Sequence, residues 1–445
     1  MTPGSSRRLL LVAGCLWLAA LGARAAEPLP HRSPHESVGT VNCASSTCHG
    51  AVTPWETGHV LRNEYTTWSR LDPHTRAWAV LDTARSNEIV RKLGYAQPAT
   101  KVQACLDCHG HSPPADLRGP RFVASEGVGC EGCHGPAGDW LAPHAREGAS
   151  HEDNLAHGLY PTDQPLAQAR LCLSCHFGDE TRFVTHRMMG AGHPRLSFEL
   201  KTFTALAPAH YRVDEDYVSR KGRPDAMRLW AVGQALAARQ QLSTLLDPKR
   251  GRQGLMPELV LFDCHACHHP MSELRWQPRP GHSPGIVRLN DSSFLMLRAL
   301  VRALWPAEAE GFAVRILALH KAVAGDAGDP MANAQAVAGL VDAQIPRLAQ
   351  ADFPPATQLA LLRALIDESA APGYADYAGA EQAYMALTSV ANALLEAGAL
   401  GEAQRWREAM AHLLQTLRHD EQFKAAEFRH RLDELRALVA VKTRS

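Results

Sequence analysis

The chain has 445 residues, with 46 lysines and arginines against 46 aspartates and glutamates. This balance argues against a protein that binds nucleic acid or an anionic membrane surface, because both need an excess of positive charge. Beyond the N-terminal segment no run of about 18 uninterrupted apolar residues occurs that could span a bilayer. The length corresponds to two or three domains.

The N-terminus has the pattern of an export signal. Two arginines precede an apolar stretch from Leu9 to Leu21, and Ala23-Arg24-Ala25 matches a small-x-small cleavage site. The segment ending at Cys15 resembles a lipoprotein box, but the apolar run continues beyond it, which favours an ordinary signal over a lipid anchor. We therefore predict a signal peptide over residues 1–26 and a periplasmic mature protein.

Five motifs follow, each with two cysteines and a histidine directly after the second cysteine. Together they hold ten of the 11 cysteines. Four are Cys-x-x-Cys-His, whereas the first, Cys43-Ala-Ser-Ser-Thr-Cys48-His49, has four residues between its cysteines. This pattern is typical of covalent haem attachment, in which two thiols bond to the porphyrin and the adjacent imidazole ligates the iron. We predict five haem c groups, attached through Cys43, Cys48, Cys105, Cys108, Cys130, Cys133, Cys172, Cys175, Cys264 and Cys267. The proximal ligands would be His49, His109, His134, His176 and His268.

Two alternatives use the same cysteines. Pairs of Cys-x-x-Cys are also typical of zinc ribbons, and each pair could instead form a disulfide. Neither alternative requires a histidine directly after every second cysteine. The haem interpretation accounts for all five histidines and is the one we adopt.

The ligand on the far side of each iron decides between electron transfer and catalysis. A second histidine gives an iron that only passes electrons, whereas an open position can bind a small substrate. Sequence context selects five distal candidates: His74, after an Asp-Pro turn and between two tryptophans; His144, one turn-rich segment beyond the third motif; His186 and His193, on either side of a Met-Met pair; and His269, directly after the fifth motif.

The C-terminal part has no cysteines, and apolar residues recur in it at helical spacing. One stripe begins near Ser292 and stops at Pro306, and similar stripes continue to Val439. An earlier helix is predicted from Asp225 to Leu246. The predicted fold is mainly α. A multihaem cytochrome c domain over residues 27–285, with short helices and loops around haems, precedes an all-helical domain of antiparallel hairpins over residues 286–445.

Several blocks resemble one known family. Gly127-Val-Gly-Cys130-Glu-Gly-Cys-His134-Gly-Pro136 resembles the signature of the cytochrome c-554 family of multihaem cytochromes. Asp72-Pro-His74 is similar to its distal-ligand segment, and His144 occupies the place of its later histidine. Ala191-Gly-His193-Pro and Cys264-His-Ala-Cys-His-His-Pro270 resemble blocks of its longer members. The resemblance implies closely packed haems, mostly with two histidine ligands, that transfer electrons in the periplasm.

The sequence thus predicts a periplasmic five-haem cytochrome that carries electrons between periplasmic or membrane-bound redox proteins. The alternative is a haem enzyme with one open iron that acts on a small nitrogen or sulfur compound. In a third interpretation the helical domain binds a partner and the protein is a scaffold. The excess of candidate distal histidines favours the carrier, and no catalytic residue is predicted.

Overall fold

The computed structural model of the protein describes residues 27–254, 256–268, 288–368 and 373–441. The predicted signal peptide, with Cys15, lies outside these residues, and so does His269. The chain is mainly helical, as predicted. No helix in the described part of the chain is both long and apolar enough to cross a membrane.

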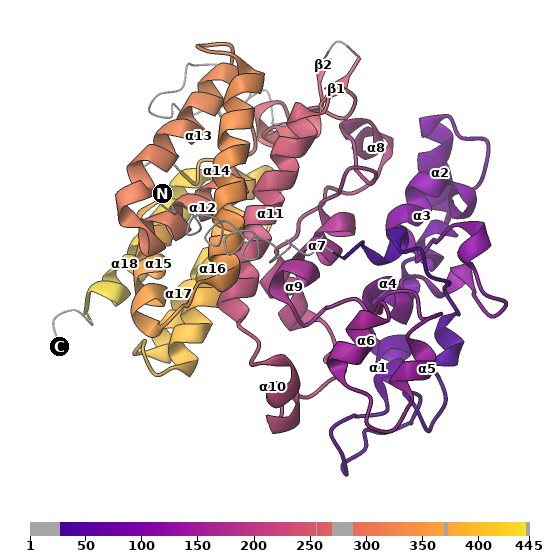
Figure 1. Cartoon of the computed structure of the whole chain (residues 1–445). Helices are drawn as coiled ribbons and strands as arrows, with labels where there is room; N and C mark the ends of the chain where they lie inside the picture. Colours follow the sequence, from indigo (N-terminus) through magenta and orange to yellow (C-terminus); the bar gives the residue numbers. More distant parts are fainter. Residues whose placement is uncertain (1–26, 255, 269–287, 369–372, 442–445) are drawn as a thin grey trace, which may run out of the picture.

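Short helices joined by long loops make up the first half of the chain, drawn indigo to magenta in Figure 1. Helix ends coincide with residues that stop helices: α2 ends at Gly94, whose φ of 90° is the left-handed conformation that glycine adopts without strain. The helices are α1 (Glu64–Leu71), α2 (Ala84–Leu93), α3 (Gln103–His109), α4 (Cys130–His134), α5 (Leu141–His144), α6 (His151–Ala156), α7 (Pro165–His176), α8 (His186–Ala191), α9 (Leu200–Leu206) and α10 (Glu215–Lys221).

Longer helices follow. The predicted helix from Asp225 to Leu246 is confirmed as α11 (Ala226–Leu246), and the Asp225 carboxylate caps it by accepting from the amides of Met227 and Arg228. A short antiparallel pair of strands, β1 (Arg252–Gln253) and β2 (Met256–Pro257), comes next. The remaining helices are α12 (Ser292–Leu304), α13 (Ala309–Val323), α14 (Pro330–Gln350), α15 (Pro355–Asp367), α16 (Tyr377–Glu396), α17 (Ala403–Gln415) and α18 (Ala425–Val441).

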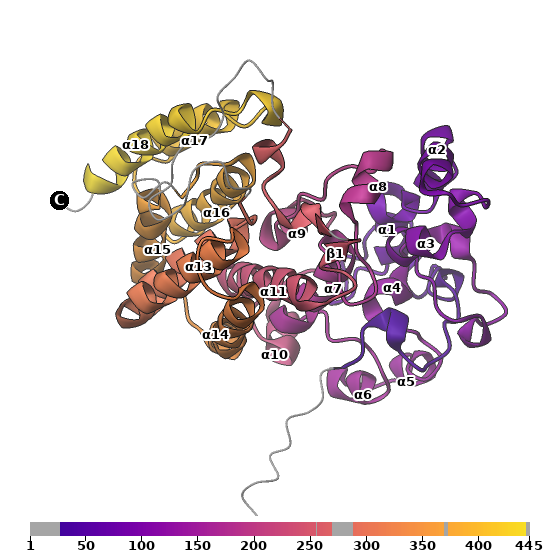
Figure 2. The same ribbon diagram turned by 90° about the horizontal axis from the view of Figure 1, so that it is seen from above.

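One hydrophobic core extends from Ala169 in α7 to Val439 in α18. Helix α11 is at its centre: it packs against α14, α12 and α16 on one side and against α7 and α9 on the other. Figure 2 shows α11 between the long helices and the short-helix part. The division near residue 285 stays a prediction about folding units. The helix N-terminal to it shares a core with the helices C-terminal to it.

A buried ion-pair cluster lies within the helical part. The Glu368 side chain is 0% exposed and faces the guanidinium groups of Arg298, at 3.3 Å, and Arg302, at 3.2 Å. Both arginines come from α12, whereas Glu368 directly follows α15, so the cluster joins two helices.

Replacing Glu368 with Ala should lower the free energy of unfolding by about 2–3 kcal/mol. Removing one partner of a buried ion pair costs about 3–5 kcal/mol, and the partly exposed arginines reduce this because water can reach them. Urea unfolding followed by circular dichroism measures the change. The control is Glu396→Ala, at an exposed position of α16, which should change stability by less than about 0.5 kcal/mol. Equal stability of the two variants would contradict the prediction.

Candidate haem sites

Three of the motifs lie on helices, and the helix itself arranges their ligands. In α3, α4 and the last turn of α7 the two cysteines and the histidine are at positions i, i+3 and i+4. These positions share one face of an α-helix, so both thiols and the imidazole can approach the same group. The fifth motif begins in a single turn of 3-10 helix, Cys264–Ala266, and the His268 amide donates to the Cys264 carbonyl at 2.8 Å.

The wide first motif closes with the same backbone contact. The His49 amide donates to the Cys43 carbonyl at 3.2 Å, and the intervening residues form a turn in which the Cys48 amide donates to Ser45. The following residue has to be glycine, because a Cβ on Gly50 would lie 1.9 Å from the Ala44 carbonyl oxygen. The two additional residues are thus looped out, and the motif keeps the relation between its first cysteine and its histidine.

Every motif histidine faces a second histidine. Four ring pairs are edge-on or tilted and one is stacked, yet the distances between ring centroids fall in a narrow range. They are His49–His144 at 6.1 Å, His74–His176 at 5.9 Å, His109–His193 at 6.3 Å, His134–His210 at 6.2 Å and His186–His268 at 6.2 Å. The partners come from segments far apart in the sequence.

This spacing fits two imidazoles that share one metal ion. An imidazole nitrogen binds a first-row metal at about 2.0–2.1 Å and lies about 1.1 Å from its ring centre, so two imidazoles on opposite sides of one ion have centres about 6.2 Å apart. All five pairs agree with this value to within a few tenths of an ångström. The residues therefore fit a haem iron with a proximal and a distal histidine at each motif.

Four of the predicted distal histidines occupy such positions: His74, His144, His186 and His193 each face one motif histidine. The fifth position, opposite His134, is taken by His210, which the sequence analysis did not select. His210 lies in the loop between α9 and α10, far from any motif along the chain. Its one sequence signal is the adjacent Tyr211, whose ring packs edge-on against it at 5.8 Å.

Hydrogen bonds orient four of these ten rings. The Nδ1 atom of His49 donates to the Glu64 carboxylate at 2.9 Å, and that of His74 donates to the Asp72 carboxylate at 2.8 Å. The Nδ1 atoms of His109 and His193 donate to the carbonyls of Ala77, at 2.9 Å, and Pro194, at 2.8 Å. Each bond fixes the tautomer and leaves Nε2 as the nitrogen available to a metal.

Burial sets the charge of other rings. Desolvation lowers the pKa of His134 to about 3 and that of His176 to about 4, so both imidazoles are neutral at pH 7. By contrast, hydrogen bonds to Glu64 and Asp72 raise the pKa of His49 and His74. The neutral form is the one that can ligate a metal.

The motif thiols match neither a set of disulfides nor a zinc site in the described part of the chain. No disulfide joins the ten described cysteines. Among the described residues, no motif brings three ligand atoms within the short mutual distances that a tetrahedral zinc site requires. The arrangement of thiols and imidazoles therefore fits haem attachment better than either alternative.

Contacts between thiols bring neighbouring sites together. The Cys43 thiol contacts that of Cys130, which places the first site beside the third. The Cys108 thiol contacts that of Cys175, which places the second beside the fourth. The third site lies near the fourth as well, since the Cys133 thiol is within electrostatic range of the Cys172 and Cys175 thiols. Helix α8 connects the second and fifth sites, since it begins with His186 and His193 follows its C-cap residue, Gly192.

Residues of the C-terminal helical part contact the fifth motif. Asp263, directly before Cys264, accepts from the Arg288 guanidinium at 2.7 Å. The ring of His265, inside the motif, packs edge-on against Tyr377 of α16 at 6.0 Å. Close by, Arg195 pairs with Glu381 of the same helix at 3.2 Å. Residues after position 285 therefore form part of the surroundings of the fifth site.

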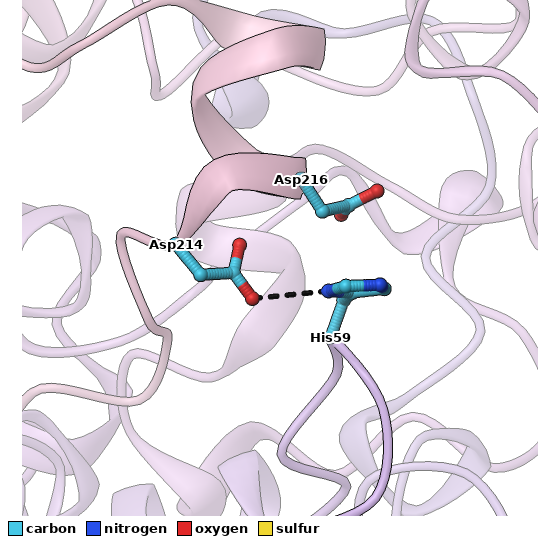
Figure 3. Close-up of side chains that lie close together, drawn as sticks. All are labelled: His59, Asp214 and Asp216. Atoms are coloured by element: carbon cyan, nitrogen blue, oxygen red, sulfur yellow. Dashed lines mark hydrogen bonds and ion pairs between the residues drawn. The ribbon is translucent and has the colours of Figure 1, made fainter.

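One other group of ligand-type residues stands out in the described part of the chain. Figure 3 shows His59, Asp214 and Asp216, whose ligand atoms all lie within 4.8 Å of one another. Each has a partner already: His59 Nδ1 is 3.1 Å from the Asp214 carboxylate, which also caps α10, and Asp216 pairs with Arg220. The group links the 52–60 loop to the segment that carries His210.

Comparison with known proteins identifies part of the chain. Residues 42–135 match the family model of cytochrome c554 and c-prime, which confirms the resemblance over this segment. The segment contains the first three motifs and His74. No curated protein and no solved structure gives a significant match.

Proposed function

We propose that this chain is a five-haem c-type cytochrome that carries electrons between redox partners. The proposal starts from the match of residues 42–135 to the cytochrome c554 and c-prime family. The observation that carries the proposal is the second histidine opposite every motif histidine, at 5.9–6.3 Å between ring centroids. Bound haem c supplies reversible one-electron chemistry. The chain would provide each site with two thiols and two imidazoles.

The paired imidazoles favour a carrier over an enzyme. A haem enzyme that acts on a small nitrogen or sulfur compound needs one axial position to remain open. In this chain two imidazoles would be available to hold the iron at each of the five sites, including the third site, where His210 faces His134. The two histidines of each pair would hold the iron in one coordination state and exclude substrate.

The contacts between sites support transfer along a continuous series. The neighbouring thiols and helix α8 give the order first, third, fourth, second, fifth, which differs from the order in the sequence. The first and fifth sites are the ends of this series. Redox partners would therefore meet the protein near the Cys43 motif and near the Cys264 motif.

The place of action and the partners follow from the same proposal. The export signal predicted over residues 1–26 would direct the chain out of the cytoplasm. In bacteria, covalent haem attachment takes place outside the cytoplasm. Partners would be periplasmic or membrane-bound redox proteins. The helical part closes around the fifth site and would also offer a docking surface there.

The mature protein should carry five covalent haems, because all five motifs supply two thiols and an imidazole. Intact-mass spectrometry of the purified protein measures the number directly. The wide first motif closes through the same backbone contact as the fifth one, so we expect it to carry a haem as well. A variant with both Cys43 and Cys48 replaced by serine should therefore carry four haems, because the thiols that attach the first haem are gone. Four haems in the natural protein, with these two thiols unmodified, would contradict the count.

A further inference from the structure

We propose that Glu64 and Asp72 set the reduction potentials of the first and fourth haem sites, and that each lowers the potential of its site. The inference rests on the proposed function, since it concerns irons ligated by His49 and His74. Glu64 is the first residue of α1, and Asp72 directly follows the last residue of that helix. One short helix thus has at its two ends the carboxylates that face these two ligands.

The contacts are specific. Glu64 uses one carboxylate oxygen for His49 Nδ1, at 2.9 Å, and the other for the Arg62 amide, at 3.1 Å. Asp72 uses a single oxygen for both the Nδ1 atom of His74, at 2.8 Å, and the backbone amide of the same residue, at 2.9 Å. Both carboxylates are largely buried, with side chains 18% and 17% exposed, so water screens their charge weakly.

A carboxylate acts on a ligand imidazole differently from a carbonyl. When a ligand imidazole donates its other N–H to a carboxylate, the ring becomes a more basic ligand, and the negative charge also stabilises the more positive ferric iron. Both effects lower the reduction potential. The second site provides an internal comparison, because His109 and His193 donate to the neutral carbonyls of Ala77 and Pro194.

Another charge acts in the opposite direction at the fourth site. The Arg182 guanidinium lies 3.0 Å from the Cys175 sulfur, and a nearby positive charge raises a potential. Removal of the Asp72 charge should therefore raise the potential of the fourth site from a value that Arg182 also influences.

The test uses the charge-removing, shape-preserving variants Glu64→Gln and Asp72→Asn in the full haem-loaded protein. In Asp72→Asn the remaining amide oxygen can accept both the imidazole and the backbone N–H. In Glu64→Gln it can accept from His49, but the new NH2 group then faces the Arg62 amide, so Asp72→Asn is the cleaner substitution. A redox titration followed by optical and electron paramagnetic resonance spectra should show one component shifted upward in each variant, by about a factor of ten in the ferric–ferrous equilibrium, or 59 mV for one electron. All five irons should remain low-spin, which separates a change in ligand basicity from loss of the ligand.

Matched controls are Glu56→Gln and Asp82→Asn, exposed acids near the same segment that contact none of the ligand rings in the described structure. They should leave all potentials within experimental error. A third variant, Glu64→Asp, keeps the charge and should stay closer to the natural protein than Glu64→Gln. If Glu64→Gln fails to load haem, Asp72→Asn decides the question alone.

Unchanged potentials in both amide variants, with five low-spin irons retained, would overturn this inference and leave the proposed function standing. A natural protein with fewer than five haems, or with a high-spin iron at the first or fourth site, would contradict the proposed function instead. Equal upward shifts in the variants and their controls would also overturn the inference, because the effect would then be general charge loss.

Discussion

Replacing His210 with Ala is expected to convert one low-spin iron into a high-spin iron without changing the number of attached haems. Attachment depends on Cys130 and Cys133, which the substitution leaves in place. The iron would keep only the imidazole of His134. The His210 ring, whose centroid lies 6.2 Å from that of His134, would be absent. Its potential should rise, because loss of a strong imidazole ligand favours the ferrous state. Electron paramagnetic resonance of the oxidised protein detects the conversion.

The matched control is His157→Ala. His157 is exposed and donates from Nδ1 to the Asp153 carbonyl, and its ring faces no motif histidine in the described structure. Its removal should leave all five irons low-spin. The same comparison applies to His74, whose replacement should open the fourth site. A His210→Ala spectrum indistinguishable from that of the natural protein would mean that His210 merely packs against Tyr211.

Removing residues 286–445 is expected to abolish accumulation of a soluble, haem-loaded protein. Helix α11 would lose α12, α14 and α16 and expose side chains such as Trp230, Leu229 and Leu242, which are buried now. Burial of each large apolar side chain contributes about 1.5–3 kcal/mol, so these losses approach the whole stability of a typical domain, about 5–15 kcal/mol. Yield of soluble haem protein after export measures the effect.

Supplying residues 286–445 as a separate exported chain is the companion experiment. It should restore part of the soluble yield, because the missing partners of α11 are then present. A truncated chain that is soluble, carries five haems and keeps five low-spin irons would contradict the expectation. That result would instead support residues 27–285 as a unit that folds by itself.

The motifs could be predicted from sequence because their chemistry is local. In three motifs two thiols and an imidazole lie on one turn of helix, and in the other two they are likewise close in the chain, so spacing alone identifies them. The helix α11 was likewise predictable from its apolar residues and its cap at Asp225. The spacing of apolar residues could not show that α11 packs against both the short helices before it and the long helices after it. Its contacts with α7 and with α14 are made by residues far apart in the chain.

The distal ligands show the limit more sharply. His74 and His144 have local signals, an Asp-Pro turn and a nearby haem motif, and both face motif histidines. His210 has neither signal: it lies in a loop, and only the folded chain brings it to His134. Local context identifies a ligand when the surrounding turn is itself distinctive. It fails when tertiary packing alone determines the pairing.

The long sequence separation within each histidine pair has a consequence for how the protein acquires its structure. Partners lie roughly 75 to 100 residues apart in the chain. Contacts between residues so far apart in sequence form late, because closing a long loop costs conformational entropy. A chain with attached haems would hold five irons with an exchangeable position while it folds, and the 18 histidines other than the five motif ligands would compete for them. Refolding from denaturant should therefore be slow and multiphasic, and a pH low enough to protonate the unpaired imidazoles should make it faster by releasing misligated intermediates.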